Sequence, residues 1–82
     1  MSRTVLVTGS SRGLGATIAR VLVHNGFKVV INYFKSKDAA EQLVSELGVE
    51  NAIALYADVT KREDVESMMQ SATAHYGQID VV

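Results

Sequence analysis

A glycine-rich run near the start of the chain has the residue types that bind a phosphate group. Its sequence is Thr8-Gly9-Ser10-Ser11-Arg12-Gly13-Leu14-Gly15, directly after the apolar stretch 5–7. Glycines let the backbone approach an anion closely, and the N–H groups at the start of a following helix point toward that anion. The run therefore predicts a cradle for a phosphate or pyrophosphate; the alternative is a turn that only connects a strand to a helix.

The spacing of these glycines differs from two other phosphate-binding patterns. No Gly-Lys-Ser/Thr closes the run, as it would in a P-loop, and the spacing is not the G-x-G-x-x-G of many dinucleotide-binding domains. The place of the run after the first strand-like segment still favours a binding site, because dinucleotides bind at the carboxyl ends of strands in open α/β sheets.

Strand-like and helix-like segments alternate along the chain. Residues 4–8, 28–33 and 52–57 have strand character, and a fourth strand begins near residue 79. Apolar residues recur at helical spacing after the first three strands: Leu14, Ile18, Val21 and Leu22 within 13–25, then Ala40, Leu43, Val44 and Leu47, then Val65, Met68, Met69, Ala72 and Tyr76. The order β-α-β-α-β-α-β favours an α/β fold with a parallel sheet and crossover helices.

The second and third helices carry candidate start signals. Asp38 and Glu41 have the spacing of a capping pair, and Thr60-Lys61-Arg62-Glu63 fits a capping box. Three glycines follow the helical segments and mark their ends: Gly26, Gly48 and Gly77.

Composition argues against several classes of function. The 82 residues correspond to one domain at most, and the absence of cysteine excludes disulfides and thiolate metal sites. A formal net charge of -1 does not favour nucleic-acid binding, and no apolar stretch is long enough for a signal peptide or a membrane span. We expect a cytoplasmic protein without a metal site, with His24 and His75 as surface residues near helix ends.

The run 8–15 resembles the cofactor motif of the short-chain dehydrogenase/reductase family, and most of all its 3-oxoacyl-(acyl-carrier-protein) reductase branch. Ala57-Asp58-Val59-Thr60 and the segment 76–82 are further matches, so the resemblance covers essentially the whole chain. It implies the first half of a Rossmann-type doubly wound sheet with strand order 3-2-1-4. We expect residues 1–82 to be the N-terminal NADP(H)-binding part of a longer Rossmann domain, truncated in strand four.

The resemblance also implies roles for individual residues. The turn from Gly9 to Gly15 would carry the pyrophosphate, with the backbone N–H of Leu14 as a donor. Asp58 would accept a hydrogen bond from the adenine amino group, with the backbone of Val59 beside it. The alternative for Asp58 is an ordinary turn residue near the start of a helix.

The end of the second strand-like segment favours NADP(H) over NAD(H). NAD-binding domains of this type place an acidic residue there to hold the ribose 2′-hydroxyl, whereas this chain has Asn32-Tyr33-Phe34. Asn32 and Tyr33 are expected to lie at the cofactor. Arg12, Lys35 and Ser36 suit a 2′-phosphate, because cations and a hydroxyl bind that anion well. The alternative for Lys35 and Lys37 is a pair of solvated charges in a turn.

The family's catalytic centre is a Ser, a Tyr and a Lys, the last two spaced Tyr-x-x-x-Lys on one helix, where the Lys lowers the Tyr pKa. Tyr33 and Lys37 have this spacing but span a strand end and a turn, so we interpret the match as a coincidence. Tyr56 and Tyr76 are interpreted as packing residues, and Met68-Met69 as core. The catalytic residues are expected beyond Val82.

The sequence thus predicts the cofactor-binding part of a reductase that moves a hydride between NADPH and a carbonyl. The resemblance implies a 3-oxoacyl thioester as substrate, a small molecule or one bound to an acyl carrier, and a homotetrameric parent. The 82-residue chain alone is expected to be inactive. Two alternatives remain: a free-standing nucleotide-binding module without catalysis, or a related reductase for a sugar, a steroid or an enoyl thioester.

Overall fold

The computed structural model describes residues 3–9 and 13–81, and within these ranges strands and helices alternate. The strands are β1 (Thr4–Val7), β2 (Lys28–Tyr33), β3 (Ala52–Tyr56) and β4 (Asp80–Val81). The helices are α1 (Gly13–His24), α2 (Lys37–Leu47) and α3 (Arg62–Tyr76). None of these helices combines the length and the apolar character needed to cross a membrane. The predicted alternation of elements is therefore observed.

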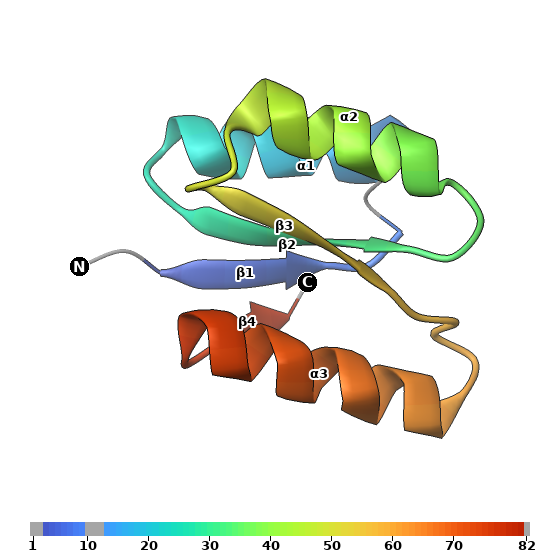
Figure 1. The fold of residues 1–82 in the computed structure, drawn as a ribbon. Coiled ribbons are helices and arrows are strands. Elements are labelled where there is room, and N and C mark those ends of the chain that lie inside the picture. The colour runs from blue at the N-terminus through green and yellow to red at the C-terminus, as the bar shows by residue number, and fades with distance from the viewer. Residues whose placement is uncertain (1–2, 10–12, 82) are drawn as a thin grey trace.

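The strands form one parallel sheet in the order β3-β2-β1-β4. Helices α1 and α2 cover one face of this sheet and α3 covers the other (Figure 1). The register pairs Val7 with Ile31 and Tyr33 with Tyr56, so the carboxyl ends of β1, β2 and β3 lie at one edge of the sheet. The architecture is the first half of a Rossmann-type doubly wound fold, in which ligands bind at this edge.

Two apolar clusters hold the layers together, one on each face of the sheet. The cluster under α1 and α2 includes Val29 and Ile31 of β2, and the cluster under α3 includes Leu6 and Val30. Three consecutive residues of β2, from Val29 to Ile31, are fully buried, as expected for a central strand covered on both faces. This rigid centre fixes the position of the strand ends.

The buried face of α1 is made of small side chains. Leu14 and Val21 are 76% and 55% exposed, whereas Ala16 and Ala19 face the sheet. Small side chains let a helix approach the sheet closely, and the larger apolar residues of α1 then lie beside the contact or outside it. The apolar spacing identified the helix correctly, but it did not include the two alanines that make the buried contact.

Neither predicted capping pair forms. The N-cap residues of α2 and α3 are Ser36 and Lys61, and neither helix has a side-chain hydrogen bond of the capping type. The hydroxyl of Thr60 instead donates to Oδ1 of Asp58, and this local bond competes with the capping box. Strands predicted to end at Thr8 and Ala57 end one residue earlier.

Candidate functional site

A groove opens at the carboxyl ends of β1, β2 and β3. Its volume is about 380 Å³, and its lining comes from the end of β2 and from the turns that follow the three strands. The lining residues are Gly9, Asn32, Tyr33, Phe34, Lys35, Ser36, Ala57, Asp58 and Val59. A cavity at this place in a parallel α/β sheet is the expected location of a nucleotide or dinucleotide.

Asn32, the penultimate residue of β2, joins all three turns. Its side-chain Oδ1 accepts a hydrogen bond from the backbone N–H of Gly9 at 2.9 Å. Its Nδ2 donates to the carbonyl of Ala57 at 3.2 Å, and more weakly to that of Tyr33 at 3.5 Å. The residue is only 3% exposed, so these bonds satisfy a buried amide and fix the turns relative to one another.

The turn after β3 presents Asp58 as a carboxylate. Its Oδ1 accepts hydrogen bonds from the backbone N–H of Thr60 at 3.0 Å and from the Thr60 hydroxyl at 2.6 Å. These two bonds hold the pKa of the Asp58 carboxyl below its ordinary value, so the group is an anion at neutral pH. The backbone N–H of Asp58 donates to Oδ2 of Asp64 at 3.1 Å, which anchors the turn to α3.

The turn after β2 combines an aromatic ring with a cation. Phe34 is 46% exposed, its ring centroid lies 6.0 Å from that of Tyr56, and Lys35 Nζ lies 5.6 Å from the Phe34 centroid. Tyr56, predicted as a packing residue, is 51% exposed but makes an edge-on contact with Tyr33 at 6.1 Å. Among the described residues that line the groove, Lys35 and Asp58 are the charged ones, so no carboxylate follows β2 here.

The glycine-rich turn leads into the first turn of α1. Gly9 and Gly13 have φ values of 60° and 68°, in the left-handed region that other residues rarely adopt. A Cβ built at either position meets no atom within 4 Å, so the surface beside this backbone is open to a ligand. Ser10, Ser11 and Arg12, predicted to bind the cofactor, lie outside the described residues.

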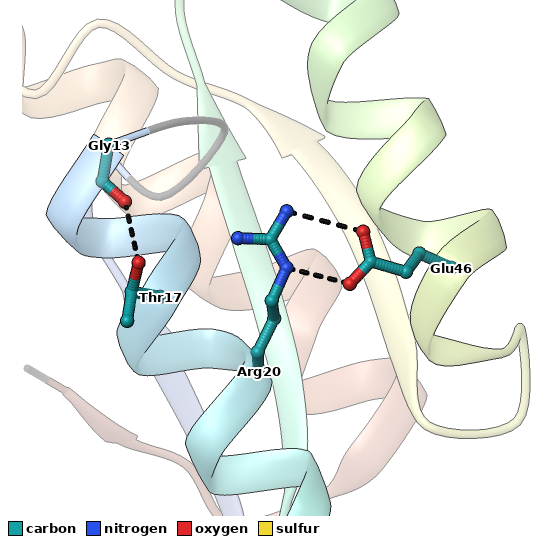
Figure 2. A network of polar contacts seen from close by, with 4 residues as sticks. All are labelled: Gly13, Thr17, Arg20 and Glu46. Atoms are coloured by element: carbon teal, nitrogen blue, oxygen red, sulfur yellow. Dashed lines mark hydrogen bonds and ion pairs between the residues drawn. The ribbon is translucent and has the colours of Figure 1, made fainter.

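Two polar contacts stabilise α1 along its length (Figure 2). The hydroxyl of Thr17 donates to the carbonyl of Gly13 at 3.3 Å. Arg20 meets Glu46 of α2 through two bonds, Nε to Oε2 at 2.6 Å and Nη2 to Oε1 at 3.2 Å. The first contact lies within the first turn of α1, and the second joins α1 to α2.

The structure brings together most of the predicted site residues. Seven of them line the groove: Gly9, Asn32, Tyr33, Lys35, Ser36, Asp58 and Val59. Gly13, Leu14 and Gly15 begin α1 and are not among its lining residues. Sequence reasoning missed Phe34 and Ala57; an aromatic residue in an otherwise polar turn was the available signal for Phe34.

Residues set aside as non-catalytic lie in ordinary structural positions. Tyr33 ends β2 and Lys37 begins α2, so their four-residue spacing does not place them on one helix face. His24 and His75 lie in the last turns of α1 and α3, and both are exposed. Within the described ranges, no three histidine or acidic side chains gather as metal ligands do.

The family model of the short chain dehydrogenases matches residues 3–82. The chain belongs to the short-chain dehydrogenase family. The chain is 45% identical, over 98% of its length, to a protein of Zymoseptoria tritici named probable tetrahydroxynaphthalene reductase. It is 41% identical, over its full length, to a 3-oxoacyl-(acyl-carrier-protein) reductase of Staphylococcus epidermidis.

Solved structures of the short-chain dehydrogenase family have the same fold. A Burkholderia cenocepacia protein described as a dehydrogenase with bound NADP superposes with a TM-score of 0.88 at 31% identity, over 96% of this chain and 32% of that one. This chain covers 31% of the fungal relative and 34% of the staphylococcal one. It therefore spans about a third of the length of these family members.

Proposed function

We propose that this chain is the NADP(H)-binding part of a short-chain reductase that moves a hydride between NADPH and a carbonyl compound. The observation that carries the proposal is the composition of the groove. Lys35 and Ser36 follow β2 where an NAD-binding domain has an acidic residue, and Asp58 faces the same space from β3. A cation and a hydroxyl are suitable partners for a 2′-phosphate, which distinguishes NADP from NAD.

The remaining parts of the cofactor would follow the lining of the groove. The pyrophosphate would lie beside the open space at Gly9 and Gly13, where the N–H groups at the start of α1 and the helix dipole favour an anion. Adenine would lie near Val59 and Phe34, whose apolar side chains are 53% and 46% exposed. Asp58, held as an acceptor by Thr60, would bind the adenine amino group.

The bound cofactor would supply the hydride, and the protein would bind and orient it. In the family, proton transfer to the substrate oxygen belongs to the Ser, Tyr and Lys of the catalytic centre. The sequence has no helical Tyr-x-x-x-Lys among its 82 residues, so we expect these residues alone to bind cofactor without catalysis. The proposed substrate is a 3-oxoacyl thioester, supported by the likeness to the staphylococcal reductase.

The fungal relative broadens the range of substrates that deserve testing. Its name describes a reductase of a hydroxylated naphthalene, so a polycyclic aromatic ketone is the second candidate for the carbonyl compound. We further propose a cytoplasmic, homotetrameric parent protein, in line with the family resemblance.

A nucleotide competition experiment tests the proposal. The intact protein is titrated with NADPH and NADH by cofactor fluorescence, and 2′,5′-ADP and 5′-ADP then compete for the site. Tighter binding of NADPH and of 2′,5′-ADP supports the proposal; equal affinity within each pair contradicts the NADP preference, and absence of binding contradicts the cofactor role. NADPH oxidation with acetoacetyl thioester and with an aromatic ketone then distinguishes the two substrate classes.

A further inference from the structure

Asn32 lines the groove, although its side chain is almost fully buried. Its Oδ1 accepts a hydrogen bond from the backbone N–H of Gly9, and its Nδ2 donates one to the carbonyl of Ala57. Gly9 belongs to the glycine-rich turn, and Ala57 immediately precedes Asp58. The amide therefore connects the part of the groove that suits a pyrophosphate to the part that suits an adenine.

The contact uses the backbone N–H of Gly9, which is directed at Asn32 and not at the space above the turn. Gly9 thus contributes to the site through its conformation, with φ of 60°, and the N–H groups at the start of α1 remain for the anion. A buried side chain sets the direction in which the glycine-rich turn leaves β1.

An asparagine side chain meets this requirement because it offers an acceptor and a donor on one planar group. Aspartate has the same shape but is an acceptor only when ionised, and leucine offers neither function. At 3% exposure, an unpaired carbonyl or N–H would be costly. The pattern of partners therefore specifies an amide at this position.

We propose that Asn32 is a positioning residue that locks the turns after β1 and β3 into the geometry that binds both halves of the cofactor. The inference rests on the proposed function and deepens it. The side chain acts through Gly9 and Ala57, and it organises the groove before the cofactor arrives. Preorganisation of this kind lowers the entropy that binding must overcome.

The test is Asn32→Asp, read as a function of pH. At about pH 8 the carboxylate still accepts from Gly9, but it cannot donate to Ala57 and it adds a negative charge beneath the pyrophosphate site. Burial and the facing carbonyl raise the pKa of the introduced carboxyl. At about pH 5 the protonated group regains a donor and mimics the amide.

Asn51→Asp is the matched control. The Nδ2 of Asn51 donates to the carbonyl of Leu47 at 2.9 Å, just before the amino end of β3 and away from the groove lining. The substitution makes the same chemical change at the opposite end of the sheet from the groove. Asn32→Ala is the second variant, because it removes both bonds without introducing a group that titrates.

Binding of NADP to the intact protein is measured by calorimetry across this pH range and expressed as the ratio of variant to wild type. The titratable groups near the site are Tyr33, Lys35 and Asp58 of the groove and Asp64, which accepts a hydrogen bond from the Asp58 backbone. Taking the ratio removes the pH effects that variant and wild type share, whether they come from these groups or from the ligand. We expect Asn32→Asp to bind at least about tenfold more weakly near pH 8 and to recover most of that loss near pH 5. Asn32→Ala should be weak at every pH, and Asn51→Asp should match wild type.

Two results would overturn the inference in different ways. Wild type that binds NADP, with an Asn32→Asp ratio independent of pH, overturns the positioning role and leaves the proposed function intact. Wild type that binds no dinucleotide overturns both, because the groove would then hold no cofactor for Asn32 to position.

Discussion

The ammonium group of Lys35 lies 5.6 Å from the centre of the Phe34 ring, at the mouth of the groove. The contact orders two neighbouring residues of the turn after β2 without neutralising the charge, because an aromatic face attracts a cation and leaves its other donors free. A phosphate on the ribose of a bound nucleotide would therefore meet a positioned cation. Lys37, two residues later, begins α2 and does not line the groove.

Because Lys35 lines the groove and Lys37 does not, the same substitution at these two positions should give different results. Lys35→Ala should weaken NADPH binding by about tenfold or more, since a charge-assisted hydrogen bond is lost, and should change NADH binding little. Lys37→Ala should leave the ratio of the two affinities unchanged. Fluorescence titration of each variant with both cofactors measures the ratios, and equal effects of the two substitutions would count against a 2′-phosphate subsite at Lys35.

The sequence predicted the fold well, for a physical reason. Strand patterns such as 28–33 belong to a parallel sheet buried on both faces, so the apolar run is continuous and its ends are sharp. Leu14 and Val21 belong to the apolar spacing that identified α1 but are exposed, because helical spacing does not say which residues pack closely against the sheet. The small Ala16 and Ala19 make the closest contact.

The sequence placed several residues of the groove lining at the ends of strands, but it did not predict the bonds between them. The positions of Lys35, Ser36 and Asp58 after strands sufficed to place them at one edge, since parallel strands end together. The bond from Gly9 to Asn32 joins residues 23 positions apart and depends on the register of β1 with β2. Spacing along the chain contains no information about such a register.

The Thr60 hydroxyl has a predicted effect on stability that depends on pH. It holds the pKa of Asp58 below its ordinary value, so its stabilising effect is present above the ordinary carboxyl pKa and is lost as the pH falls through the lowered one. Thr60→Val should therefore destabilise the protein at neutral pH, by a margin that shrinks in strong acid. Denaturant unfolding across this range measures the margin.

Thr73→Val is the control for Thr60→Val. Thr73 is exposed on α3, and its hydroxyl bonds no described residue. The control should show little change at any pH. A Thr60→Val deficit that stays constant into strong acid would show that the hydroxyl does not act through Asp58.

Removal of the Tyr76 hydroxyl should not destabilise the protein, in contrast to removal of the Thr60 hydroxyl. Its hydroxyl oxygen is buried without a hydrogen-bond partner among the described residues, and burial raises its pKa. Tyr76→Phe keeps the ring packed against the cluster under α3 and removes the unsatisfied group, so stability should be unchanged or higher by up to about 1 kcal/mol.

The advantage of Tyr76→Phe should grow in alkali. A raised pKa in the folded state means that stability is complete below the ordinary tyrosine pKa and declines as the pH rises through the raised one. Phenylalanine cannot ionise, so the variant should resist this decline. Tyr56→Phe, at an exposed ring, is the control, and denaturant midpoints that fall equally in Tyr76→Phe and wild type would contradict the prediction.

The ion pair between Arg20 and Glu46 links α1 to α2, and its contribution should be small and sensitive to salt. Both side chains are about half exposed, at 48% and 52%, so water and ions screen the pair even though it is bidentate (Figure 2). Glu46→Gln should lower the thermal midpoint modestly at low salt, and about 1 M salt should remove most of the difference. The pKa of Glu46 is lowered by Arg20, so the stabilisation is also lost as the pH falls through that lowered value.

Glu66→Gln provides the comparison for Glu46→Gln. Glu66 pairs with Arg62 within α3 through one bond of 3.1 Å, so that pair is monodentate and local. The Arg62 side chain is 91% exposed, so the pair is also more fully solvated. Its removal should shift the thermal midpoint less than removal of Glu46 does. A larger shift for Glu66→Gln would contradict this ranking of the two pairs. A Glu46→Gln deficit that persists in high salt would show that screened charge is not the source of the stabilisation, because glutamine keeps the side-chain stem.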